Sequence, residues 1–98
     1  ESMLKNIGSV VRNRKKDTDL ACLLVLLVRT GNIDENMKYK PFHEALKSQF
    51  HDAGIGTERR PQQLYNNMVF YGGKTLTSNT LKRCENLIEE HRKALQIQ

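Results

Sequence analysis

The sequence has no tryptophan and only three tyrosines and three phenylalanines, so aliphatic side chains must fill most of any core. It also lacks a long apolar segment. Its longest apolar run, residues 20–28, is less than half of the about 20 residues that a membrane-spanning helix needs. The run also lies too far from the first residue to be a signal peptide. We therefore expect no membrane partner.

Cysteine is scarce as well. The two cysteines, Cys22 and Cys84, are too few for a disulfide framework. Cys22 lies inside the apolar run, and Cys84 falls on an apolar stripe of a predicted helix. Both are therefore expected to be reduced core residues of an intracellular protein.

Motifs for catalysis or metal binding are missing too. His43 and His51, like Cys84 and His91, stand at spacings that match neither CxxC nor HxxxH. There is no phosphate-binding glycine loop followed by Lys-Ser or Lys-Thr, and no nucleophile elbow. We expect no metal, no cofactor and no enzymatic activity, with His43 at the surface and His91 at the edge of the core.

What the sequence does have is an excess of positive charge. Its 98 residues, enough for one domain spanning 1–98, carry 16 Lys and Arg against 11 Asp and Glu, a net charge of +5. Much of the excess lies in residues 1–16. A basic balance favours an anionic partner such as nucleic acid, an acidic peptide or a membrane face, although many basic domains bind no anion.

Apolar residues recur at helical spacing along the chain, which predicts an all-α fold: a single small bundle of about five helices. Residues 20–28 are apolar on every side, which is typical of a central helix, with a buried strand as the competing interpretation. Asp17 to Asp19 are expected to cap this helix, and residues 32–40 to form a polar loop. The expected helices span residues 2 to about 14, 20–28, 41–53, about 61–71 and 78–95.

The first expected helix has a polar side and one weak point. Lys5, Arg12 and Arg14 are expected on the side that faces water. Gly8 is expected to weaken the same helix by about 1 kcal/mol relative to alanine.

The most informative stretch is the start of the fourth expected helix, near Pro61. Asparagine and glutamine can make paired hydrogen bonds to adenine, and arginines at a helix start can hold a phosphate beside the free N–H groups. A solvated polar face is the competing interpretation. The basic stretch 12–16 could add contacts, or serve as a nuclear import signal or a solvated helix end. The candidate nucleic-acid-binding residues are Arg59, Arg60, Gln62, Gln63, Asn66, Asn67, Arg12, Arg14, Lys15 and Lys16.

The order of elements over residues 20–71 resembles the three-helix SANT/Myb-like fold. Residues 59–68, Arg-Arg-Pro-Gln-Gln-Leu-Tyr-Asn-Asn-Met, are similar to the opening of that family's last helix. The resemblance implies a helix-turn-helix-like core, with residues 78–95 as an additional C-terminal helix. It places Leu64 and Met68 in the core. The residues that it places toward DNA or histones are Arg60, Gln62, Gln63, Asn66 and Asn67. The family's spaced tryptophans are absent. A weaker resemblance, to the nematode-type SPK domain, rests on Pro41-Phe42, Phe50, Gly54 and Leu64.

Two functional hypotheses follow. The first is a nuclear DNA- or chromatin-binding module that contacts nucleic acid through the helix starting near Pro61. The second is a protein-interaction or self-association module of a chromatin-associated assembly. Its partner or second copy would dock on the apolar stripe of the last helix, formed by Leu81, Leu87, Ile88 and Leu95.

Overall fold

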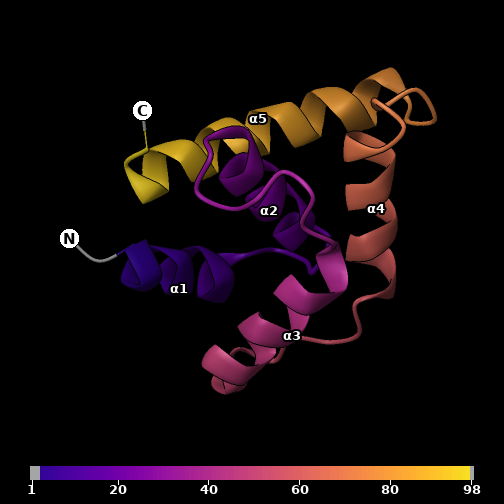
Figure 1. Cartoon of the computed structure of the whole chain (residues 1–98). Coiled ribbons are helices and arrows are strands. Elements are labelled where there is room, and N and C mark those ends of the chain that lie inside the picture. The colour runs from indigo at the N-terminus through magenta and orange to yellow at the C-terminus, as the bar shows by residue number, and fades with distance from the viewer. Residues whose placement is uncertain (1–2, 98) are drawn as a thin grey trace.

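The computed structural model describes residues 3–97, which fold into five α-helices and one short 3-10 helix without a strand (Figure 1). The predicted all-α bundle is therefore confirmed. The elements are α1 (Met3–Asn13), α2 (Asp19–Arg29), α3 (Tyr39–Gln49), η1 (His51–Ala53), α4 (Arg59–Val69) and α5 (Ser78–Leu95).

Helix α2 is the centre of the bundle. Its residues 20–27 are each no more than 2% exposed. Helices α3, α4 and α5 pack against it, while α1 packs against α5, and Figure 1 shows α2 in the middle of this ring. A helix that is apolar on all sides is stable only when it is covered on all sides. The central-helix interpretation is confirmed, and the strand alternative is wrong.

The prediction that side chains of residues 17–19 cap α2 is wrong. Thr18 occupies the N-cap position, and no side-chain cap hydrogen bond forms there. The turn before the helix already provides backbone partners, because the Asp19 and Leu20 amides donate to the carbonyls of Lys16 and Asp17. The Asp17 and Asp19 carboxylates are thereby free to bind other groups.

Helix α3 begins earlier than the sequence indicated, because Tyr39 belongs to it and is buried. Its ring lies 6.0 Å, centroid to centroid, from the rings of both Phe42 and Tyr65. The buried face of α3 consists of Tyr39, Phe42, His43 and Leu46, at the i, i+3, i+4, i+7 spacing of a helix. The expected loop over residues 32–40 is therefore wrong at its C-terminal end, because Tyr39 and Lys40 already belong to α3.

Helix α5 covers α2 with the stripe that was a candidate dimer surface. A side chain caps its start, since the Thr77 hydroxyl oxygen accepts from the Thr80 amide at 3.1 Å. Ile88 and Leu95 are buried inside the bundle, whereas Leu81 and Leu87 are half-buried. Two of the four stripe residues are thus already used within the chain and cannot receive a partner.

Gly8 is required by packing, although the sequence suggested only a weak point of α1. A Cβ at this position would lie 2.9 Å from Cε1 of the buried Phe50 ring. Such a distance is too short for two carbon atoms. The missing side chain is therefore what allows α1 to approach the end of α3.

We expect Gly8→Ala to lower the free energy of unfolding by about 1–3 kcal/mol, because the new methyl group overpacks the Phe50 contact. Urea denaturation measures the change. Lys5→Ala, on the exposed side of the same helix, is the control and should stay within about 0.5 kcal/mol of wild type. In a Phe50→Leu background the alanine should cost less. A gain of stability, as at an ordinary helical glycine, would contradict this packing role.

Candidate functional site

The loop that leads into α4 is held by a chain of buried hydrogen bonds. His43 is 0% exposed, and its Nε2 lies 2.9 Å from the Gly56 carbonyl oxygen. A carbonyl only accepts, so Nε2 carries the proton. The Tyr39 hydroxyl then donates to Nδ1 at 2.7 Å. The expectation that His43 lies at the surface is wrong, because the fold uses both of its ring nitrogens.

Asp17 holds the same loop from the other side. Its Oδ2 accepts from the Gly56 amide at 2.8 Å, and its Oδ1 accepts from Arg14 Nε at 2.8 Å. Partial burial raises the pKa of the Asp17 carboxyl, but these hydrogen bonds and the Arg14 charge outweigh that effect and leave the pKa below its ordinary value. The carboxylate is therefore fully ionised at neutral pH.

Arg14 completes this set of contacts. Its guanidinium also donates to the Val11 carbonyl at 2.7 Å and to the Ala53 carbonyl at 3.2 Å, and its side chain is only 10% exposed. Arg14 is thus an internal tie between α1, the turn before α2 and the end of η1. The expectation that Arg14 faces water is therefore wrong. We call the set Tyr39, His43, Gly56, Asp17 and Arg14 the Gly56 clamp.

The Gly56 clamp positions the start of α4, whose outer face carries the predicted contact residues. Pro61, Tyr65 and Met68 point into the core. At about 100° per residue, Arg59, Gln63 and Asn66 fall on the opposite side. Together with neighbouring residues they surround a shallow hollow of about 560 Å³, the α4 hollow, which is lined by Thr57, Glu58, Arg59, Gln62, Gln63 and Asn66.

Four of the six predicted α4 residues therefore meet at one place. The other two, Arg60 and Asn67, do not line the α4 hollow. Within residues 3–97, none of the six side chains makes a hydrogen bond or an ion pair. The described ion pairs join Arg12 to Asp52, Arg14 to Asp17, Arg29 to Glu85 and Arg92 to Glu89. The α4 side chains are thus available to a ligand.

The far end of α4 presents two aromatic rings that sequence reasoning left out of the site. Phe70 is 48% and Tyr71 is 58% exposed. The helix was expected to reach about residue 71, but α4 ends at Val69 and the chain turns away at Gly72, with a φ of +61°. The Lys38 ammonium lies 5.3 Å from the Phe70 ring centroid, so positive charge accompanies the exposed rings.

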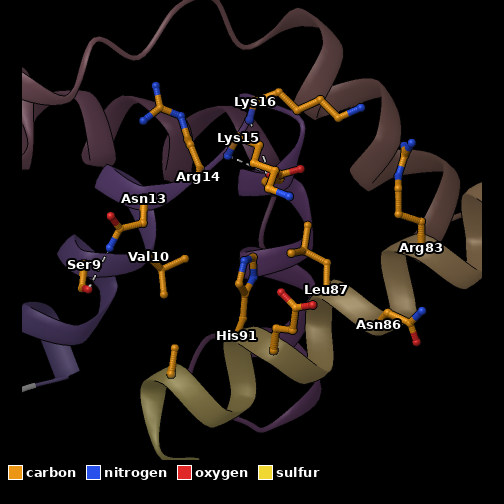
Figure 2. Close-up of a pocket in the computed structure, with 13 residues that line it drawn as sticks. Ser9, Val10, Asn13, Arg14, Lys15, Lys16, Arg83, Asn86, Leu87 and His91 are labelled. Carbon is orange, nitrogen blue, oxygen red and sulfur yellow. Dashed lines mark hydrogen bonds between the residues drawn. The ribbon is translucent and has the colours of Figure 1, made fainter.

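The basic stretch 12–16 does not extend the α4 hollow. Arg12 pairs with Asp52 and lies 5.2 Å above the Phe50 ring. Lys15 and Lys16 instead line a cleft of about 500 Å³ between the end of α1 and α5, the α1–α5 cleft (Figure 2). Sequence reasoning missed this cleft because residues 9–19 and 83–94 meet only in the folded bundle.

Inside the α1–α5 cleft, His91 is a buried polar side chain that lacks a partner. It is 7% exposed, and its Nδ1 finds no hydrogen-bond partner among the described residues. Figure 2 shows its ring projecting from α5 into the space between Val10, Leu87 and Lys15. Burial lowers the pKa of His91, and the negative charges of Asp19 and Glu90 only partly offset this. The ring is neutral at pH 7.

Among residues 3–97, no three His, Cys, Asp or Glu side chains gather where they could hold a metal ion. Cys22 and Cys84 are buried free thiols, and burial together with the neighbouring Cys84 raises the pKa of Cys22. No helix in the described part of the chain is both long enough and apolar enough to span a bilayer.

The protein is therefore a small all-helical domain with two candidate binding surfaces, the α4 hollow and the α1–α5 cleft. It belongs to a family of unknown function, DUF6043, which matches residues 1–96. No curated protein and no solved structure matches the chain. The resemblance to SANT/Myb-like and SPK domains is wrong, since neither family matches. It rested on a short stretch at the start of α4 and lacked the family's tryptophans.

We expect Arg14→Met to lower the free energy of unfolding by about 2–3 kcal/mol, because it leaves Asp17 and two carbonyls without their charged donor. Thermal and urea unfolding measure the loss. Arg60→Met removes the same charge from an exposed side chain and should stay within about 0.5 kcal/mol of wild type. Equal effects of the two substitutions would show that Arg14 has no structural role.

We expect His91→Leu to raise the free energy of unfolding by about 1 kcal/mol at pH 7, because it removes a buried nitrogen without a partner. The pKa of His91 is lowered in the folded state, so the unfolded chain binds the proton more readily. Stability is then lost as pH falls below the ordinary histidine range. Between pH 7 and pH 5 wild type should lose more stability than His91→Leu. Parallel pH profiles would contradict this assignment.

Proposed function

We propose that the protein binds nucleic acid through the outer face of α4. The observation that carries the proposal is the convergence of Arg59, Gln62, Gln63 and Asn66 on the α4 hollow, with side chains that make no hydrogen bond within residues 3–97. Amide side chains can both donate to and accept from base edges, and an α-helix fits the major groove of duplex DNA.

The start of α4 suits a phosphate group. No side chain caps it, so the first backbone N–H groups remain open to an anion. Arg59 and Arg60 are exposed there without an ion pair among the described residues. Glu58 is the one carboxylate that lines the α4 hollow, where it balances the charge of Arg59, so the net positive charge at the helix start comes from Arg60 outside the hollow. The net charge of +5 supports attraction to nucleic acid over a longer range.

The Gly56 clamp supports the proposal because it fixes the loop from which α4 begins. Recognition of bases requires side chains that are held by a rigid scaffold, since a loosely held helix start would lose its register on the duplex. Gly56 stands three residues before Arg59, and its amide and carbonyl are both fixed by buried or half-buried side chains. The loop therefore holds the backbone at the start of α4 in one position.

The exposed aromatic pair favours a second candidate, a docking site for a protein partner. Phe70 and Tyr71 are neighbours in the sequence, and exposed aromatic rings are enriched at protein interfaces. In this alternative the amides of α4 would form the polar rim of the interface. The nuclear location expected from the sequence stays a prediction that rests on the basic stretch 12–16, since the SANT/Myb-like resemblance is wrong.

We expect wild type to bind duplex DNA with an affinity that falls as salt rises, and Arg59→Ala to weaken all sequences alike while flattening the salt slope by about one unit. Gln63→Ala and Asn66→Ala should instead reduce base preference, by about 1–3 kcal/mol for each lost paired contact. Selection from a randomised duplex pool first identifies a preferred site, and fluorescence anisotropy then compares it with a scrambled duplex.

Matched control variants come from α3. Gln49→Ala removes an exposed amide and Lys47→Ala an exposed charge, and both should bind as wild type does. The absence of binding at low salt would overturn the proposal. Loss of a protein partner in Phe70→Ala and Tyr71→Ala variants, with DNA affinity absent throughout, would establish the second candidate.

A further inference from the structure

We propose that the α1–α5 cleft binds a small phosphorylated organic molecule of about nucleotide size, at a site separate from the α4 hollow. The cleft volume of about 500 Å³ lies in the range of small-molecule sites, roughly 300–1,000 Å³. None of its lining residues comes from α4, because it is formed by the end of α1, the turn before α2 and the middle of α5.

The cleft walls suit an organic body as well as an anion. Val10, Leu87 and Ala94 provide apolar surface, and the Asn13 and Asn86 amides offer donors and acceptors beside it. Ligand sites commonly combine apolar walls with a few polar groups that fix orientation. Inorganic phosphate alone would leave these walls uncovered.

The charges at the cleft favour a phosphate. Lys15, Lys16 and Arg83 are exposed and have no ion pair among the described residues, while Arg14 is already paired with Asp17. Figure 2 shows Lys16 and Arg83 on one side of the opening, with Lys15 above His91. Asp19 also lines the cleft, but its Oδ2 accepts from the Lys15 amide at 3.2 Å. Glu90 is the remaining carboxylate. The three unpaired cations exceed the two carboxylates by one charge, which favours a phosphate over a neutral ligand.

His91 is the independent observation that points to a ligand. Its Nδ1 is buried on the wall of this cleft without a partner in residues 3–97. A buried polar atom without a hydrogen bond destabilises the fold, and an apolar side chain of similar size would avoid that loss. The Nδ1 atom itself is covered while the ring borders the cleft, so a rotation of the ring would bring the accepting nitrogen of neutral imidazole to a ligand hydroxyl or N–H group. The phosphate would remain at the lysine side of the cleft.

The probes for the test are adenosine monophosphate, glucose 6-phosphate, adenosine and inorganic phosphate, titrated into the full chain by calorimetry. The His91 ring signals are followed by NMR in parallel. We expect at least one phosphorylated probe to bind and to shift the His91 signals. Its body without phosphate, and inorganic phosphate alone, should bind about tenfold more weakly or not at all. Lys16→Gln/Arg83→Gln should weaken binding about tenfold.

Lys47→Gln/Lys74→Gln removes the same charge outside the cleft and should leave the affinity unchanged. His91→Leu should also weaken binding. A urea unfolding curve of this variant is the control that it remains folded. Arg59→Ala should not affect these probes, so failure here is distinguishable from failure of the α4 proposal. Three results would each overturn the inference: no binding of either phosphorylated probe at millimolar concentration, equal binding of inorganic phosphate, or equal weakening by the Lys47/Lys74 control.

Discussion

The Gly56 clamp is the constraint on which the arrangement of the outer helices depends. Gly56 belongs to no helix, yet its carbonyl binds His43 from α3 and its amide binds Asp17 from the turn before α2. Arg14 connects that turn back to α1 and forward to Ala53. Separate parts of the chain thus meet around one residue, where a Cβ would lie 3.0 Å from the Asp17 carboxylate. These contacts fix the loop from which α4 begins.

Helix α2 explains why the chain has two separate candidate binding surfaces. A helix that must be covered on every side recruits α3, α4 and α5 around itself, and each of them turns its apolar stripe inward. The polar face of α4 is then directed outward, away from the core. The end of α1 and the middle of α5 approach one another beside the N-terminal end of α2, and the α1–α5 cleft lies between them. One surface is therefore a helix face and the other a gap between helices.

The two surfaces also differ in how the sequence could reveal them. The α4 face is local, since Arg59, Gln62, Gln63 and Asn66 follow one another at helical spacing, and the order of residues alone is enough to group them. The cleft joins Lys15 and Lys16 to Arg83 and His91, which stand far apart in the sequence. Lys15 and Lys16 were predicted to join the contact residues of α4. That grouping is wrong, because no local pattern indicates which distant helix lies beside them.

Sequence alone was sufficient to predict the helical class, the central position of the segment 20–28 and the polar face of α4, because each depends on periodicity along one helix. The roles of several polar residues, in contrast, emerged only from the packing of the helices. Arg14 and His43 looked like surface residues, yet both became internal partners of the α3–α4 loop. Ile88 and Leu95 looked available and became core. Burial of a polar group depends on whether distant segments bring it a matching donor or acceptor, and that match exists only once the helices have packed.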